Sequence, residues 1–202
     1  MDSYLQIFLK GIKPGGQPGS ASTVAFTSTV PGEGVSYVTQ SFAAELAQRT
    51  RRKTLIADIS VLQRIDIFHY NQASRHCAET DVPYLFVLQA GNDGTTGLST
   101  NPRALAPLMA GSDLDQGLSN LQTLRFVFDF ILVDCSSMKA SADAAFFASA
   151  VDGVILVVEA DKTRKEQVRN AITSMEMAEA NVLGCVLNKR RYPIPNWVYR
   201  RI

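Results

Sequence analysis

Short apolar runs alternate with segments of helical periodicity along most of this chain, and this alternation limits the folds that it can adopt. The runs are continuous rather than alternating in polarity, as is typical of strands buried on both faces of a sheet. They lie at residues 24–28, 54–58, 84–89, 127–134, 153–159 and 182–188. The segments with helical spacing are 36–48, 102–109, 114–126, 141–150 and 164–180. The pattern predicts an α/β fold of three layers, with a mostly parallel sheet between helices on both faces.

Composition excludes several classes of protein. Hydrophobic residues make up 46% and charged residues 19% of the 202 residues, so the chain can bury a core and is neither disordered nor fibrous. The 20 Lys and Arg nearly balance the 19 Asp and Glu, and we therefore expect no nucleic acid partner. No apolar run approaches the length of a membrane span, and the three cysteines are far apart in sequence. These features predict a soluble protein of the reducing cytoplasm.

We expect a single domain flanked by two short segments. Residues 1–22 are predicted to form a flexible arm, because four glycines and two prolines fall within residues 11–23. The α/β domain is predicted to span residues 23–189. Residues 190–202 form a tail that mixes aromatic residues with arginines.

A glycine-containing loop connects the first predicted strand to the first predicted helix. Loops in this position bind phosphate through backbone N–H groups and the N-terminus of the helix, and a Ser or Thr hydroxyl then binds Mg²⁺. The residues that we expect to contact a nucleotide are Pro31, Gly32, Glu33, Gly34, Val35, Ser36 and Tyr37. Ser36 is the expected Mg²⁺ ligand. The alternative is an ordinary turn in which Ser36 is the N-cap of the helix.

Two aspartates end predicted strands. Asp58 follows one apolar run and Asp134 follows another. Ligands of open parallel sheets bind at the carboxyl ends of the strands, so both aspartates are candidate catalytic residues. We expect Asp134 to bind Mg²⁺ together with Ser36. The alternative is that each aspartate only begins the turn after its strand.

The order and spacing of several motifs resemble the bacterial tyrosine kinases, or BY-kinases. Residues 27–47 resemble the glycine loop and first helix of this family, and residues 52–58 resemble its second strand. Residues 128–134 resemble its Walker B strand, and residues 182–189 its last strand. BY-kinases are cytosolic partners of polysaccharide co-polymerases in capsule and exopolysaccharide export. They belong to the deviant Walker class, which also contains the Min-type and partition ATPases.

The resemblance, which extends over residues 23–202, implies a P-loop NTPase-like fold and a site for ATP or ADP with Mg²⁺. Asn188 resembles the family residue that meets the adenine ring. The family often carries a phosphorylated tyrosine cluster near its C-terminus; this chain lacks a dense cluster, and Tyr192 and Tyr199 are the available phosphoacceptors. The implied partner is the cytosolic segment of a membrane polysaccharide co-polymerase, which would place the chain at the inner face of the membrane. A homo-oligomer is also implied.

The chain departs from the family at four places. Val35 stands where the family has the loop lysine, Ser60 where it has the second Asp of an Asp-x-Asp, and Leu62 near an expected Arg. The segment 59–83 is also shorter than in the family. Loss of a charged hydrogen bond costs about 1.5–3 kcal/mol, which weakens binding about ten- to a hundredfold. Phosphoryl transfer depends still more on that charge, so we expect weak nucleotide binding with little or no kinase activity.

Three functions therefore remain open. The first is a BY-kinase-like regulator or scaffold of a membrane co-polymerase in polysaccharide biosynthesis, with a degenerate nucleotide site. The second is an active tyrosine autokinase in which a displaced lysine replaces Val35; the sequence candidates are Lys53, Lys139 and Lys162. The third is a relative of the partition and Min-type ATPases that positions cargo.

Overall fold

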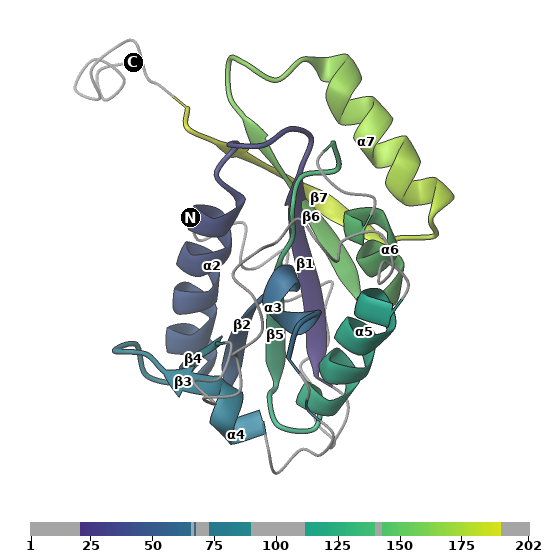
Figure 1. Cartoon of the computed structure of the whole chain (residues 1–202). Helices are drawn as coiled ribbons and strands as arrows, with labels where there is room; N and C mark the ends of the chain where they lie inside the picture. Colours follow the sequence, from purple (N-terminus) through teal and green to yellow (C-terminus); the bar gives the residue numbers. More distant parts are fainter. Residues whose placement is uncertain (1–20, 66, 68–72, 90–111, 140–142, 191–202) are drawn as a thin grey trace, which may run out of the picture.

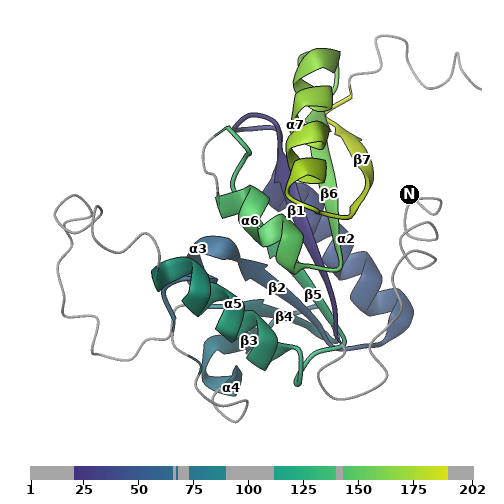
Figure 2. The ribbon, with the colours of Figure 1, turned by 90° about the vertical axis from the view of Figure 1, so that its right-hand side faces the viewer.

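Seven strands form one sheet in the order β3-β4-β2-β5-β1-β6-β7, shown in Figures 1 and 2. The computed structural model describes residues 21–65, 67, 73–89, 112–139 and 143–190. The strands are β1 (Ser22–Ser28), β2 (Thr54–Asp58), β3 (Cys77–Glu79), β4 (Leu85–Leu88), β5 (Phe130–Asp134), β6 (Gly153–Glu159) and β7 (Val182–Asn188). All neighbouring strands run parallel except β3, which pairs antiparallel with β4.

Helices cover both faces of the sheet. Helix α2 (Val35–Thr50) lies on one face, and α5 (Ser112–Leu124), α6 (Asp143–Ala150) and α7 (Lys165–Met177) lie on the other (Figures 1 and 2). Within β5, Leu132 packs on the α2 side and Ile131 on the opposite side, and both are fully buried. The predicted three-layer α/β fold with a mostly parallel sheet is confirmed. Within the described residues, no helix is both long and apolar enough to cross a membrane.

The predicted strands all form, with shifts at their ends. The apolar run 127–134 becomes a strand only from Phe130, because the preceding residues form a turn after α5 in which the N–H of Val127 donates to the carbonyl of Leu124. Three short elements were not predicted: β3, α3 (Ile59–Leu62) and α4 (Ala73–His76). Each has three or four residues, too few to establish a hydrophobic period.

Several predictions concern residues that the structure does not describe. The helix at 102–109 lies outside the described residues, as do residues 1–20 of the predicted arm and 191–202 of the predicted tail. Strand β1 begins at Ser22, within the last part of the predicted arm.

A buried amide on α5 fixes the chain that follows α3. Asn120 is fully buried, and its Nδ2 donates to the carbonyls of Leu62 and Ile65 at 2.8 and 2.7 Å. Its Oδ1 accepts from the N–H of Ile67 at 2.9 Å. One side chain therefore satisfies three backbone groups, one at the end of α3 and two in the irregular chain that follows it.

We expect Asn120→Ala to lower the free energy of unfolding by about 3 kcal/mol, because three buried backbone groups lose their partner. Urea denaturation measures the change. Ser119→Ala, at an exposed position of the same helix, is the matched control and should change stability by less than about 0.5 kcal/mol. Equal stability of the two variants would show that water or repacking replaces the amide.

Candidate functional site

The loop between β1 and α2 turns through two glycines in the left-handed region. The φ angles of Gly32 and Gly34 are 89° and 90°, values that side-chain-bearing residues rarely adopt. A Cβ atom on Gly34 would lie 2.3 Å from Nδ2 of Asn188, so space also requires glycine there. Gly34 is the N-cap of α2, which begins at Val35. Ser36 is therefore inside the first turn, and the alternative in which it caps the helix is wrong.

The N-terminus of α2 presents unpaired backbone donors. No side chain caps the helix. Among the described residues, none accepts a hydrogen bond from the backbone N–H groups of residues 32–37. Free N–H groups at the positive end of a helix dipole attract anions. The loop thus retains the feature that lets such loops bind phosphate.

The carboxylate of Glu33 holds the loop in place. Its Oε2 accepts from the N–H and hydroxyl of Thr29 at 2.7 and 2.8 Å and from the N–H of Val30 at 3.0 Å. Its Oε1 accepts from the N–H of Glu159 at 3.1 Å and from the hydroxyl of Thr163. Burial alone would raise the pKa of Glu33, but these hydrogen bonds outweigh burial and lower it. The side chain is thus committed to the protein and does not line the pocket beside the loop.

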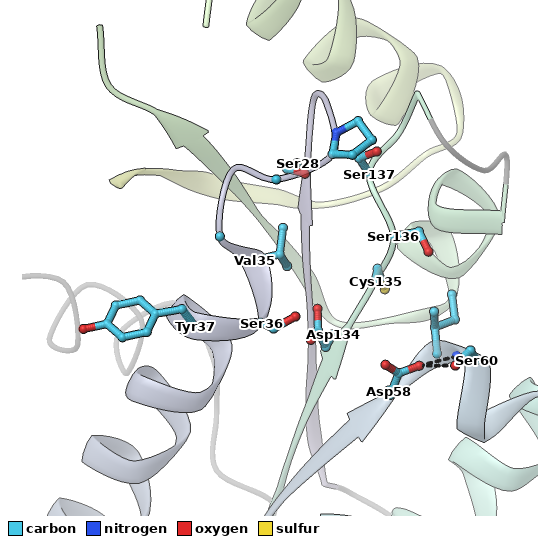
Figure 3. A pocket seen from close by; sticks show the side chains of 14 residues that line it. Ser28, Val35, Ser36, Tyr37, Asp58, Ser60, Asp134, Cys135, Ser136 and Ser137 are labelled. Atoms are coloured by element: carbon cyan, nitrogen blue, oxygen red, sulfur yellow. Dashed lines mark hydrogen bonds between the residues drawn. The ribbon is translucent and has the colours of Figure 1, made fainter. Parts of the chain in front are cut away.

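A pocket of about 380 Å³ lies between the loop and the carboxyl ends of β2 and β5 (Figure 3). The predicted site residues that line it are Pro31, Gly32, Gly34, Val35, Ser36, Tyr37, Asp58 and Asp134. The ring of Tyr37 points away from the pocket (Figure 3), and it is largely exposed. Among the predicted site residues that the structure describes, Glu33 and Asn188 do not line the pocket.

The two predicted aspartates meet beside the loop. Asp58 and Asp134 are opposite each other in the register of β2 and β5. Ser36 and Asp134 point toward one another in Figure 3. Burial raises the pKa of Asp134, the negative charge of Asp58 raises it further, and a hydrogen bond from Ser36 acts in the opposite direction. Asp58 accepts from the N–H and hydroxyl of Ser60 at 2.7 and 2.6 Å.

The oxygens of Ser36 and Asp134 suit Mg²⁺ only when waters and the phosphates of a bound nucleotide complete its coordination. Hydroxyl and carboxylate oxygens are the ligands that Mg²⁺ prefers, and Mg²⁺ usually adds waters and substrate phosphates to one or two protein carboxylates. The side chains of Ser36 and Asp134 fit that role. Among the described residues, no group of three or more His, Cys, Asp or Glu forms an all-protein metal site.

The pocket lacks a positive side chain among its described lining residues, where Val35 contributes an apolar wall (Figure 3). None of the three sequence candidates for a displaced lysine lines it. Lys53 precedes β2 at the opposite end of the strand, where its N–H donates to Asp129. Lys139 is exposed, and Lys162 is exposed and pairs with Glu159 at 3.2 Å.

Sequence reasoning missed a different lysine beside the loop. The ammonium of Lys189 donates to the carbonyl of Gly32 at 2.5 Å and lies 3.3 Å from Glu159. Next to it, Nδ2 of Asn188 donates to the carbonyl of Glu33 at 2.9 Å. The sequence could have indicated this contact. Both residues come at the end of the last predicted strand, and parallel strands end at the same edge of the sheet, where the loop also lies.

A second missed residue is Ser137, three residues after Asp134. Its side chain lines the pocket and is buried, and its hydroxyl has no hydrogen-bond partner among the described residues. Buried polar groups without a partner are rare in proteins. The segment that holds it is fixed to β1, because the N–H of Met138 donates to the carbonyl of Ser28 at 2.8 Å.

The remaining predicted positions are outside the pocket or outside the described residues. Leu62 is fully buried in the core, so its position has a packing role. Tyr192 and Tyr199 lie outside the described residues.

Known proteins resemble this chain in sequence and in fold. No family model matches the chain. The tyrosine-protein kinase CpsD of Streptococcus agalactiae is 29% identical over 182 residues, which cover 82% of this chain and 74% of that protein. The succinoglycan biosynthesis transport protein ExoP of Rhizobium meliloti is 30% identical over 185 residues, which cover 85% of this chain and 23% of that protein.

Solved structures share the fold. The VpsO kinase domain superposes with a TM-score of 0.65 at 21% identity, covering 94% of this chain and 93% of that domain. The septum site-determining protein MinD of Pyrococcus horikoshii, complexed with Mg-ADP, superposes with a TM-score of 0.56 at 16% identity, covering 90% and 76%. The chain is therefore similar in sequence to a bacterial tyrosine-protein kinase and to a succinoglycan biosynthesis transport protein, and it shares the fold of the VpsO kinase domain and of MinD.

Proposed function

We propose that this chain is a regulator or scaffold in capsule or exopolysaccharide biosynthesis, with a nucleotide site that binds Mg-ADP or Mg-ATP weakly and transfers phosphate poorly. The observation that supports it best is the pocket itself. It combines free loop N–H groups with Ser36 and Asp134, but has Val35 in place of a cation.

Weak binding is supported by what the loop retains. The backbone donors of residues 32–37 are unpaired within the described chain, and the dipole of α2 adds positive potential at the same place. Ser36 and Asp134 would hold Mg²⁺ between the protein and the phosphates. The metal would supply the positive charge that the polyphosphate needs in this pocket.

Poor transfer is supported by what the loop lacks. Asp58 and Asp134 make the pocket negative, and the apolar side chain of Val35 cannot stabilise charge that develops on a transferred phosphoryl group. The same negative potential should exclude a polyphosphate without bound Mg²⁺. Nucleotide binding should therefore depend strictly on the metal.

The competing functions have less support. An active autokinase would need a lysine in the pocket, and Lys53, Lys139 and Lys162 do not line it. A Min-type ATPase is supported only by the shared fold, because the sequences of MinD and this chain are 16% identical. The relatives matched by sequence are named for tyrosine kinases and for exopolysaccharide transport.

The proposed partner is the cytosolic segment of a membrane polysaccharide co-polymerase. This partner would place the chain in the cytoplasm at the inner face of the membrane, and self-association there would follow the arrangement expected for the family. The match with CpsD covers 74% of that protein, whereas the match with ExoP covers 23% of that protein.

Calorimetric titration with Mg-ADP tests the nucleotide site. We expect Val35→Lys to tighten binding about ten- to a hundredfold, because it restores one charged hydrogen bond to phosphate. Gln40→Lys adds the same charge at an exposed position of α2 away from the pocket and is the control. If the wild type already binds as tightly as Val35→Lys, the degenerate-site proposal is wrong.

Glu33→Gln tests whether the loop depends on the buried carboxylate. At pH 7 we expect a loss of about 2 kcal/mol in unfolding free energy, since an amide cannot accept all of the bonds that the carboxylate accepts. The native pKa of Glu33 is lowered from its ordinary value of 4.5. Its stabilising effect is therefore full above that value and is lost as the pH falls through the native pKa.

The difference in stability between wild type and Glu33→Gln should accordingly shrink in acid. Urea denaturation across the acid range measures it, with the exposed Glu176→Gln of α7 as the control. A difference that stays constant with pH would show that the effect comes from packing and not from the charge.

Co-purification with the membrane co-polymerase tests the scaffold role. We expect tagged wild type and Asp134→Asn to retain the co-polymerase equally, because the partner surface does not need a loaded nucleotide site. Retention by the wild type alone would make nucleotide binding part of the partner contact. Absence of the co-polymerase from both would overturn the proposed partner.

A further inference from the structure

Two neighbouring side chains at the end of β7 bind the outer side of the glycine loop. Lys189 donates to the carbonyl of Gly32 at 2.5 Å, and Asn188 donates to the carbonyl of Glu33 at 2.9 Å. These are consecutive carbonyls of the phosphate-binding loop. Neither Lys189 nor Asn188 lines the pocket.

Peptide geometry then determines where the loop donors point. In a trans peptide, the carbonyl of one residue and the N–H of the next point in opposite directions. The Gly32 carbonyl turned toward Lys189 therefore directs the N–H of Glu33 away from Lys189. The Glu33 carbonyl turned toward Asn188 directs the N–H of Gly34 away from Asn188. Neither N–H has an acceptor among the described residues.

We propose that Lys189 is a positioning residue of the nucleotide site, which holds the glycine loop in the conformation that lines the pocket and supplies from outside the positive charge that Val35 lacks. The inference rests on the proposed nucleotide site and deepens it. Lys189 acts through the loop backbone, so it favours binding of the phosphates but does not reach the group that would be transferred. Binding and phosphoryl transfer, which one lysine normally serves together, are separated in this arrangement.

The backbone at Lys189 agrees with this role. Its φ angle is 55°, a left-handed conformation that is uncommon outside glycine, and such conformations concentrate at functional sites. This turn directly follows β7 and carries the side chain back onto the loop. Its Cε lies 3.7 Å from where a Cβ of Gly34 would be, so the stem packs closely on the loop as well.

The chain offers a matched control for the charge. Lys162 and Lys189 contact the same Oε2 atom of Glu159, at 3.2 and 3.3 Å, but only Lys189 also contacts the glycine loop. Both ammonium groups are substantially exposed. A general effect of positive charge near Glu159 should appear in both variants, whereas positioning of the loop should appear only in one.

The test titrates Mg-ADP into the full-length chain by calorimetry. We expect Lys189→Met to weaken binding about tenfold, Lys189→Arg to retain it, and Lys162→Met to change it by less than about twofold. Adding Val35→Lys to Lys189→Met should restore binding, because the charge is then supplied within the pocket. A purely structural role of Lys189 would leave the gain from Val35→Lys the same in both backgrounds, whereas the proposal expects a larger gain in Lys189→Met than in the wild type.

A second readout without nucleotide keeps the proposal separate from the proposed function. ¹⁵N relaxation of the Glu33 and Gly34 amides should show greater motion in Lys189→Met than in the wild type or Lys162→Met. If the relaxation of these two amides is the same in Lys189→Met as in the wild type, the positioning role is wrong, whether or not Mg-ADP binds. Equal losses of binding in Lys162→Met and Lys189→Met, or an equal gain from Val35→Lys in the wild type and in Lys189→Met, would also overturn it. If the wild type binds no Mg-ADP and the amides still respond, only the proposed function fails.

Discussion

The buried carboxylate of Glu33 is the contact on which the site depends. A loop with two left-handed glycines has little conformational preference of its own, since glycine allows many backbone states. Glu33 removes that freedom by accepting five hydrogen bonds from the start of the loop, the end of β6 and the residue before the N-cap of α7. A charge that is almost completely buried is stable only when its oxygens are satisfied in this way. One side chain thus joins three elements and leaves the following backbone donors free for a ligand.

The topology of the sheet divides the surroundings of the loop into two sides. β1 lies between β5 and β6, so the loop that leaves β1 meets different chemistry to the left and right of its strand. On the β5 side, Asp134 and its neighbour Asp58 form a negative pocket suited to Mg²⁺ and phosphate. On the β6 and β7 side, Asn188 and Lys189 bind the outer carbonyls of the loop. The carboxylates that would bind Mg²⁺ and the side chains that hold the loop therefore come from opposite halves of the sheet.

Under the proposed function, this division would let the site keep nucleotide binding while phosphoryl transfer is lost. A cation inside the pocket stabilises both the bound phosphates and the charge that develops as one of them leaves. Val35 removes that cation, and Lys189 provides positive charge only from behind the loop backbone. Such a site suits a protein that senses or holds a nucleotide beside a membrane partner better than one that phosphorylates quickly. The proposed regulatory role in polysaccharide export needs no more than this.

The apolar runs and helical spacings were enough to predict the three layers, the parallel strands and the loop before α2, because these features depend on local periodicity and burial. They also placed Asp58 and Asp134 at the edge of the sheet where ligands bind, since each aspartate ends a buried parallel strand. The short elements β3, α3 and α4 escaped prediction because three or four residues show no period. The contacts of Glu33 with Thr163 and of Lys189 with Gly32 join residues 130 and 157 positions apart. No local pattern encodes such contacts: they exist only after β1, β6 and β7 lie side by side, and that arrangement selected Lys189 over the three lysines that spacing alone had suggested.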